Sequence, residues 1–583
     1  MIKKLAARVR QYKKQAIATP LFMVGEVAME ALIPLIMAWL VDRGIELGQM
    51  GSIFLYGGAL LVTALLSLFF GTASGKMAAI SSSGFARNLR HDLYYAIQDF
   101  SFSNIDKFST SSIITRLTTD VTNVQNSFQM ILRMAVRAPL TLLFSMIMAL
   151  TINARISMVF LIALPFLGFG IYWIMSRTHP VFRRVFKTYD KLNNVVQENL
   201  RGIRVVKSFV REDYEVEKFN GISSSIYKDF VHAEKNIAFM GPLMMTCIYT
   251  CTLIIAWLGA KAIIASGNNP ELGMTTGQLM SLITYVIQIL SSLMMVSMVF
   301  LMITMSRASA QRIVEILDET SDITSPENGV KEIPDGSVDF DHVHFSYASR
   351  SERDTLSDID LHIPSGSVIG ILGGTGSGKS SLVQLIPRLY DVSSGSVRVG
   401  GRDVREYDLT ALREAVAMVL QKNELFSGTI KENLRWGNEK ATDEEIMEAC
   451  RLAQADSFIQ DFADQYDYRI EQGGSNVSGG QKQRLCIARA LLKKPKILIL
   501  DDSTSAVDTR TDALIRAGFR SYIPDTTKII IAQRVSSVMD ADQIIVLDNG
   551  AVADAGSHEE LLARCAIYRD VYESQTKGEA DHE

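Results

Sequence analysis

The stretch Gly373–Ser381 reads Gly-Gly-Thr-Gly-Ser-Gly-Lys-Ser-Ser. Gly373, four intervening residues and then Gly378-Lys379-Ser380 fit the phosphate-binding loop, in which backbone N–H groups and a helix N-terminus surround an anion. We expect Lys379 to reach the terminal phosphates of the ligand and the Ser380 hydroxyl to hold Mg²⁺ beside them. The stretch therefore predicts a nucleoside triphosphate site.

The sequence around this loop agrees with that prediction. Ser367–Leu372 is a short apolar run typical of a buried strand, and Ser381–Leu389 has the pattern of a helix. Strand, loop and helix in this order are the context that the motif requires. Further upstream, Val338–Tyr347 alternates apolar and polar residues, which predicts an antiparallel strand that ends on an aromatic ring placed to stack on a base.

Two further polar motifs follow the loop. Val419-Leu420-Gln421 ends a predicted strand with an amide that is suited to ligate Mg²⁺. Asn476-Val477-Ser478-Gly479-Gly480-Gln481 opens a predicted helix and offers a second anion site. A phosphate loop followed by Ser-Gly-Gly-Gln is a specific combination.

Length and composition indicate a membrane protein with more than one domain. The chain has 583 residues, of which 48% are hydrophobic, and the apolar excess lies in its first half. The net charge of −4 shows no excess of positive charge of the kind that favours binding of nucleic acid. Five cysteines without metal-binding spacing are expected to be reduced packing residues.

Six stretches are long enough to cross a bilayer, which takes about 20 helical residues. They are 17–41, 52–79, 130–152, 156–175, 238–264 and 276–302. The basic, amphipathic Met1–Lys14 is expected to lie on the cytoplasmic membrane surface. The connections 81–129 and 176–237 are long, charged and helical in pattern, as if built to reach another domain.

Charged and flexible side chains at membrane depth suggest a substrate cavity. Glu26 and Glu30 lie one turn apart in the first span, and Arg133 and Arg137 lie one turn apart at the start of the third. These four either line a cavity or pair with one another. Met294 and Met298 belong to a methionine-rich region that either shapes the cavity or packs against lipid and helices.

On these motifs the chain resembles an ABC transporter of the exporter type over essentially its whole length. The resemblance implies a six-span α-helical transmembrane domain followed by an α/β P-loop nucleotide-binding domain, with ATP and Mg²⁺ as cofactors. It implies a half-transporter whose nucleotide-binding domains meet head to tail. Coupling helices are expected near 109–114 and 208–214.

The resemblance assigns site residues in three groups. The ATP-binding residues would be Tyr347, Gly373, Gly374, Thr375, Gly376, Ser377, Gly378, Lys379, Ser380, Ser381 and Gln421, with Ser380, Gln421 and Asp501 near the metal. The residues offered to the other subunit's ATP would be Ser478, Gly479, Gly480, Gln481 and Asp508.

Two catalytic positions depart from the family pattern. Asp502 stands where the family has the glutamate that polarises the attacking water, and aspartate is one methylene shorter. Gln533 stands where the family has a histidine that contacts the terminal phosphate, and glutamine has no titratable proton near neutral pH. We therefore expect this chain's own site to hydrolyse ATP slowly or not at all.

These departures predict a heterodimer. The partner would be a second half-transporter that carries the glutamate and the histidine, and the cargo would be hydrophobic or amphipathic. Alternatives are a lipid or peptide exporter of the same fold, a homodimeric exporter, and a nucleotide-binding membrane regulator that moves nothing.

The expected domains are 1–305 for the membrane domain, 306–336 for a connecting helix and linker, 337–573 for the nucleotide-binding domain, and 574–583 for a polar, disordered tail. The expected location is a bacterial cytoplasmic membrane, crossed several times, with the nucleotide-binding domain and both termini in the cytoplasm.

Overall fold

The computed structural model describes residues 1–268, 273–347, 354–502 and 508–580. The chain forms two compact units, one of residues 1–98 and 110–319 and the other of residues 99–109 and 320–583. The second unit therefore includes a short piece of the connection between the second and third spans. The sixth span and the expected connecting helix form one continuous helix, α11, so the first unit ends at Glu319.

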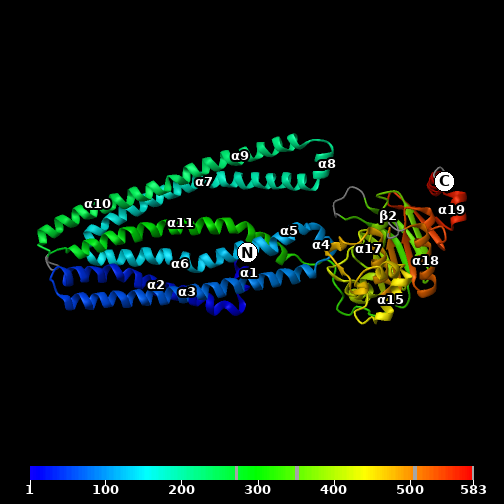
Figure 1. Cartoon of the computed structure of the whole chain (residues 1–583), viewed down its shortest axis with the longest axis horizontal. Coiled ribbons are helices and arrows are strands. Elements are labelled where there is room, and N and C mark those ends of the chain that lie inside the picture. The colour runs from blue at the N-terminus through cyan, green and yellow to red at the C-terminus, as the bar shows by residue number, and fades with distance from the viewer. Residues whose placement is uncertain (269–272, 348–353, 503–507, 581–583) are drawn as a thin grey trace. The chain divides into compact units, whose positions relative to one another are not determined.

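The first unit is helical (Figure 1). Its elements are α1 (Ile2–Ala7), η1 (Arg10–Tyr12), α2 (Lys13–Leu40), η2 (Val41–Ile45), α3 (Met50–Gln98), α5 (Thr110–Thr115), η3 (Arg116–Asp120), α6 (Val121–Ile152), α7 (Ala154–Arg201), α8 (Ile203–Ser208), α9 (Glu212–Ala238), α10 (Met240–Ser266) and α11 (Thr276–Asp318).

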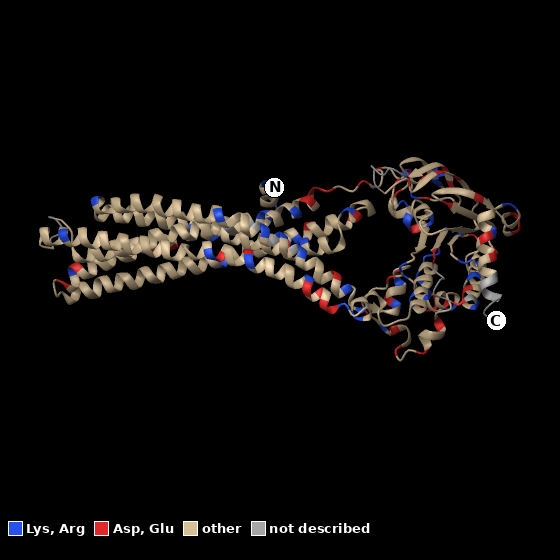
Figure 2. Cartoon of the chain, turned by 90° about the horizontal axis from the view of Figure 1, so that it is seen from above, with Lys and Arg blue, Asp and Glu red and all other residues tan. Residues whose placement is uncertain are grey.

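Among the described residues, six helical stretches are long and apolar enough to span a membrane, which confirms the predicted six-span fold. Several continue far past the apolar segment. For example, α3 has 49 residues, and α7 has 48. At 1.5 Å per residue, such helices are more than twice as long as a bilayer core is thick. Figure 2 shows that charged residues are sparse along one half of this unit and frequent along the half that holds the N-terminus.

The helix ends follow from local sequence. Asn153 begins α7 by accepting a hydrogen bond from the Ile156 backbone N–H at 3.1 Å. Thr275 begins α11 through a reciprocal capping box with Gln278. A buried apolar cluster of α6, α7, α10 and α11, with Tyr285 and Phe160 among its largest members, packs these spans together.

The second unit is an α/β domain. Its elements are α4 (Phe102–Lys107), β1 (Val338–Phe345), β2 (Leu356–Ile363), β3 (Val368–Gly373), α12 (Lys379–Gln384), β4 (Ser394–Val399), β5 (Arg402–Asp403), η4 (Val404–Glu406), α13 (Leu409–Ala415), β6 (Val416–Val419), β7 (Gly428–Thr429), α14 (Ile430–Arg435), α15 (Asp443–Leu452), α16 (Asp456–Gln460), η5 (Gln465–Asp467), β8 (Arg469–Ile470), η6 (Gln472–Gly474), α17 (Gly479–Leu492), β9 (Ile497–Asp501), α18 (Thr509–Tyr522), β10 (Thr527–Ile531), η7 (Val535–Ser537), β11 (Gln543–Asp548), β12 (Ala551–Gly556), α19 (His558–Arg564) and α20 (Ala566–Ala580).

The central sheet has the strand order β12-β11-β3-β10-β9-β6, in which only β12 pairs antiparallel. Successive side chains of a strand point to opposite faces. On β9, Ile497 and Ile499 therefore join the core shared with the antiparallel sheet β2-β1-β4-β5, whereas Leu498 and Leu500 join the core under α14, α15 and α17. The sheet is thus buried on both faces.

The expectation of a disordered tail was wrong for most of its length. α20 runs to Ala580, and Tyr568 at its start is fully buried. Gln575 of this helix accepts a hydrogen bond from the Val535 backbone N–H and donates one to the Gln533 carbonyl, both at 2.8 Å. Polar composition did not reveal that these contacts hold the segment against the domain.

Candidate functional site

The predicted phosphate loop connects β3 to α12 in the middle of the parallel sheet. Its backbone needs glycine at two positions. A Cβ on Gly373 would lie 2.2 Å from the Leu547 carbonyl oxygen, and Gly378 combines a left-handed φ of 94° with a Cβ position 2.7 Å from Leu356. Lys379 turns back over the loop, and its Nζ donates to the carbonyls of Gly373 at 2.9 Å and Gly374 at 2.7 Å.

Three further parallel strands on one side of β3 carry the other predicted residues to the same edge of the sheet. Asp501 ends β9 and Asp502 follows it, Gln533 follows β10, and Gln421 follows β6. Because carboxyl ends of parallel strands meet at one edge, residues far apart in sequence converge beside the loop. The structure thus brings the loop, both aspartates and both glutamines together.

The Ser380 hydroxyl donates to Asp501 Oδ1 at 3.1 Å. Asp501 is only 4% exposed, and this burial raises the pKa of its carboxyl group. The hydrogen bond from Ser380 lowers this pKa, whereas the negative charge of Asp502 raises it further. Burial likewise lowers the pKa of Lys379, although both aspartate charges act against that shift. Hard oxygen donors at this spacing fit Mg²⁺, whose binding would favour the ionised carboxylate.

Asp502 is held by amide groups. Gln533 Nε2 donates to Asp502 Oδ2 at 2.8 Å, and Gln421 Nε2 donates to the same oxygen at 3.4 Å. Gln483, which sequence reasoning did not single out, donates from α17 to the Asp502 carbonyl at 3.4 Å. Ser503 to Val507, which continue this run, lie outside the described residues.

Tyr347 lies beside the phosphate loop. Its hydroxyl is 2.9 Å from Ser381 Oγ and donates to Gln384 at 3.2 Å. Its ring contacts Tyr390 edge to face, at 5.1 Å between centroids, and remains half exposed. An exposed ring next to the loop is compatible with the predicted stacking on a base.

The predicted second anion site opens α17. Ser478 caps the helix, with its Oγ accepting from the Gln481 N–H at 3.3 Å and its own N–H donating to Gln481 Oε1 at 2.9 Å. Gly479 and Gly480 form the first helical turn. Asp508 caps α18 by accepting from the Thr511 N–H at 2.9 Å. The expected contacts of these residues with a second subunit remain predictions.

A segment from the first long connection belongs to the same unit as this site. Ser101 and Ser103 donate hydrogen bonds to Asp322, the latter at 2.7 Å, and Tyr390 donates to Asp106 at 2.7 Å. The docked helix is α4, which precedes the range 109–114 where the resemblance predicts a coupling helix. No local pattern marks Asp322 or Tyr390 as its partners, because they lie more than 200 residues away.

In the first unit, three of the four charged residues predicted at membrane depth form ion pairs with one another. Arg137 donates to Glu26 at 2.5 Å and to Glu30 at 2.7 Å. Glu30 and Arg137 also line a cavity. These two residues therefore both pair with each other and line a cavity, two roles that the sequence alone leaves as alternatives. The residues lining that cavity include Met295, and not Glu26, Arg133, Met294 or Met298. Met294 packs against the apolar cluster, and Met298 is exposed.

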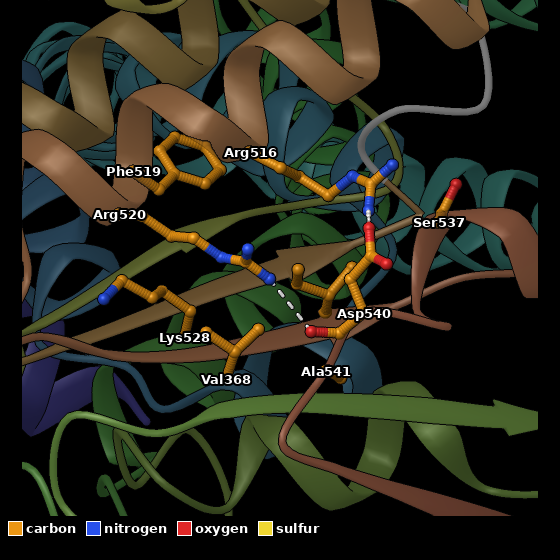
Figure 3. A pocket seen from close by; sticks show the side chains of 9 residues that line it. Val368, Arg516, Phe519, Arg520, Lys528, Ser537, Asp540 and Ala541 are labelled. Carbon is orange, nitrogen blue, oxygen red and sulfur yellow. Dashed lines mark hydrogen bonds and ion pairs between the residues drawn. The ribbon is translucent and has the colours of Figure 1, made fainter. Parts of the chain in front are cut away.

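A separate pocket lies in the second unit (Figure 3). Its walls include Val368 and Lys528, at the amino ends of β3 and β10, so it lies at the opposite edge of the sheet from the phosphate loop. Arg516 pairs with the Asp540 carboxylate at 3.1 Å, and Arg520 donates to the Asp540 carbonyl at 2.9 Å. Its volume of about 20 Å³ has room for a water molecule.

Comparisons with known proteins agree with this geometry. Residues 17–313 match the family model of the ABC transporter transmembrane region, and residues 356–505 match that of the ABC transporter. The chain is 36% identical over 574 residues to the uncharacterized ABC transporter ATP-binding protein YfiB of Bacillus subtilis (strain 168), covering 98% of each chain.

Two further similarities are informative. The chain is 32% identical to the fatty acid ABC transporter ATP-binding/permease protein of Mycobacterium bovis over 484 residues, which are 82% of this chain and 75% of that protein. It also shares its fold with a bacterial Atm1-family ABC exporter solved with ATP bound, at a TM-score of 0.80 and 23% identity, over 97% of this chain and 98% of that one.

Proposed function

The chain belongs to the ABC transporter family, with its membrane domain and its ATPase domain in one polypeptide, and from this premise we propose that it is one half of a heterodimeric, ATP-driven exporter. Its cargo is a hydrophobic or amphipathic compound. It lies in a bacterial cytoplasmic membrane with both termini and the ATPase domain inside. The partner is a second half-transporter that carries the catalytic glutamate and histidine.

The surroundings of Asp502 carry this proposal. A general base must reach the water that it activates, and Asp502 is one methylene shorter than the glutamate of the family pattern. Its Oδ2 already accepts hydrogen bonds from Gln533 and Gln421. Gln533, at the position where the family has histidine, therefore forms a hydrogen bond with the Asp502 carboxylate and has no titratable proton to supply.

Head-to-tail pairing then makes the two ATP sites unequal. The site built on this chain's Lys379, Asp501 and Asp502 binds ATP with Mg²⁺ held by Ser380, Asp501 and Gln421, and it hydrolyses ATP slowly. The other site takes its phosphate loop, glutamate and histidine from the partner and uses this chain's Ser478–Gln481. Transport depends on turnover at that second site.

Steady-state ATPase activity tests the proposal. We expect little activity from the purified chain alone and robust activity from the complex that it forms with the product of a neighbouring gene. Restoring Asp502→Glu together with Gln533→His should raise hydrolysis at this chain's site, whereas Asp502→Asn with Gln533→His should not. Rapid turnover by the lone chain would instead favour a homodimeric exporter.

A lipid cargo is the second candidate. The similarity to the mycobacterial fatty acid transporter favours it. Transport into inverted vesicles, compared for hydrophobic drugs, fatty acids and peptides, distinguishes these cargoes. Uptake that requires hydrolysis also excludes a regulator that only binds nucleotide.

A further inference from the structure

The segment that follows β10 carries Gln533 into the ATPase site, and its backbone there is extended. Arg534 has the angles φ −97° and ψ 130°. In an extended chain, the carbonyl of one residue and the N–H of the residue two positions later point to the same side. The Gln533 carbonyl and the Val535 N–H therefore face one direction, as they do in a strand that pairs with a neighbour.

Gln575 of α20 binds both of these backbone groups. Its Nε2 donates to the Gln533 carbonyl, and its Oε1 accepts from the Val535 N–H, both at 2.8 Å. One side-chain amide thus makes the two hydrogen bonds that a residue of a parallel strand would make. Because both distances are those of well-formed hydrogen bonds, the contact fixes the backbone on both sides of Arg534.

The packing of α20 determines where Gln575 lies. Tyr568 is fully buried, and its hydroxyl lies 2.6 Å from His558 Nδ1. Val571 and Tyr572 pack against the core under α14, α15 and α17. Residues three and four positions apart lie on one face of a helix, so Gln575 continues this buried face by one turn. The helix therefore presents its amide at a fixed place.

The held segment in turn presents Gln533 to Asp502. The Asp502 N–H donates to the Ile531 carbonyl at 3.0 Å, which places the ends of β9 and β10 side by side. Gln533 Nε2 donates to Asp502 Oδ2 at 2.8 Å, whereas Gln421 Nε2 lies 3.4 Å from the same oxygen. The Gln421 distance is longer than that of an ordinary N–H···O hydrogen bond, so Gln533 makes the stronger of these two contacts.

We propose that Gln575 is a positioning residue that keeps Gln533 on the Asp502 carboxylate, and so keeps hydrolysis at this ATP site slow. A hydrogen bond to an ionised carboxylate stabilises the charged form and makes the group a weaker base. It also occupies a lone pair on an oxygen that would take a proton from water. The inference rests on the proposed function, in which Asp502 stands at the position of the general base.

A second contact on the same segment provides a comparison. Ser537 donates to the buried Asp512 of α18 at 3.2 Å, two residues beyond Val535. This bond holds the far end of the segment and leaves the two bonds made by Gln575 in place. Ser537→Ala therefore loosens the segment without releasing the backbone of Gln533, which separates positioning from general loosening.

Single-turnover hydrolysis tests the proposal. The full chain in nanodiscs is mixed in excess over radiolabelled ATP with Mg²⁺, so that even slow hydrolysis is measured. Gln575→Leu, which removes both bonds, should raise the rate about fivefold. Ser537→Ala should not raise it, and Ser574→Ala, on an exposed surface of the same helix, should leave it unchanged.

The direction of the change is what distinguishes a positioning role from a structural one. A variant that merely destabilises the domain would lose activity, whereas release of Asp502 from Gln533 increases it. An unchanged or lower rate in folded Gln575→Leu, or an equal rise in Ser537→Ala, would overturn the proposal. If Gln575→Leu does not fold, Gln575→Glu keeps the acceptor for Val535, loses the donor to Gln533, and should still raise the rate.

Further variants show whether the effect passes through Gln533 and Asp502. Gln533→Ala should give the same rise, and adding Gln575→Leu to it should raise the rate no further, because residues that act through one another are not additive. In an Asp502→Asn background, Gln575→Leu should have no effect. Additive rises, or a rise without the Asp502 carboxylate, would contradict the assignment.

The ratio of the variant's rate to that of the parent chain separates this outcome from that of the proposed function. A slow parent chain whose rate Gln575→Leu does not raise would keep the heterodimer and reject the role of Gln575. A fast parent chain whose rate rises further in the variant would keep the role of Gln575 and reject the heterodimer.

Discussion

At single positions, burial decides how ionisable groups behave. Cys450 is fully buried between α15 and its neighbours, and burial raises the pKa of its thiol to about 12. Burial also raises the pKa of Cys486. These thiols match the sequence-based expectation of reduced packing residues, since only a thiolate reacts readily.

We predict that Cys450 resists alkylation by iodoacetamide from pH 7 to pH 10 in the folded chain and reacts after unfolding. An unfolded thiol has a pKa of about 8.5. Because the pKa of Cys450 is higher in the folded state, its contribution to the free energy of unfolding is present below about pH 8.5 and decreases as pH rises above that value. Mass spectrometry measures the modification. Ser521→Cys, on an exposed surface, is the control that should react in the folded state; equal rates at both positions would contradict the prediction.

Asp120 is a second position governed by burial. Its carboxylate is fully buried and accepts two hydrogen bonds from Arg312, one from Nε at 2.8 Å. Removing one partner of a buried pair leaves the other charge without compensation. This pair ties the start of α6 to the end of α11.

Arg312→Ala should therefore destabilise the membrane domain by about 3 kcal/mol, the low end for such pairs because Arg312 itself is 43% exposed. Lys4→Ala, which removes the exposed pair with Asp318, should cost less than about 1 kcal/mol. Thermal unfolding in nanodiscs compares the two variants. Similar losses of stability in the two variants would show that the burial of Asp120 does not strengthen its ion pair with Arg312.

Among the helices, α4 illustrates how an element is placed by distant partners. Its N-cap, Ser101, forms a capping box with Asn104, which the local sequence encodes. Its docking depends on Asp322 and Tyr390, and burial together with the hydrogen bond to Asp106 raises the pKa of Tyr390. The local sequence therefore determines that this helix forms, whereas contacts with distant residues determine where it lies.

Asp322→Ala should loosen this segment, because it removes the acceptor for both Ser101 and Ser103, at about 1 kcal/mol for each bond. Hydrogen exchange of residues 99–109, followed by mass spectrometry, should become faster. Asp318→Ala, a nearby exposed carboxylate of the first unit, is the matched control and should leave that exchange unchanged. Equal exchange in both variants would refute the docking role of Asp322.

For the assembled transporter, the proposed asymmetry predicts that two substitutions in this chain have different effects on the ATPase activity of the complex. Gly480→Asp introduces a charge into the motif that the active site borrows, and it should reduce ATPase activity of the complex by about 100-fold. Lys379→Met affects only the slow site and should leave most of the activity. Hydrolysis by the two purified complexes is compared at saturating ATP, with ATP binding as the check on each variant. Equal losses would indicate equivalent sites.

Much of the ATPase site could be read from the sequence because its requirements are local. A loop that wraps a phosphate needs glycines at fixed spacing, and a strand that ends in carboxylates places them at a sheet edge. The six spans could be read for a similar reason, since each must satisfy its own backbone in lipid. These features need no knowledge of the neighbouring elements.

Tertiary contacts decided what local patterns left open. Whether Glu30 and Arg137 pair or line a cavity depends on how α2 and α6 face each other, and the answer is both. The cavity also takes Gln288 and Ser291 from α11, more than 100 residues away, because helix packing selects which face each span turns inward. Asp502 could be recognised as unusual in sequence, but its hydrogen bond to Gln533 required two strands to lie side by side. Chain-local chemistry fixes which groups are present, and packing fixes which of them meet.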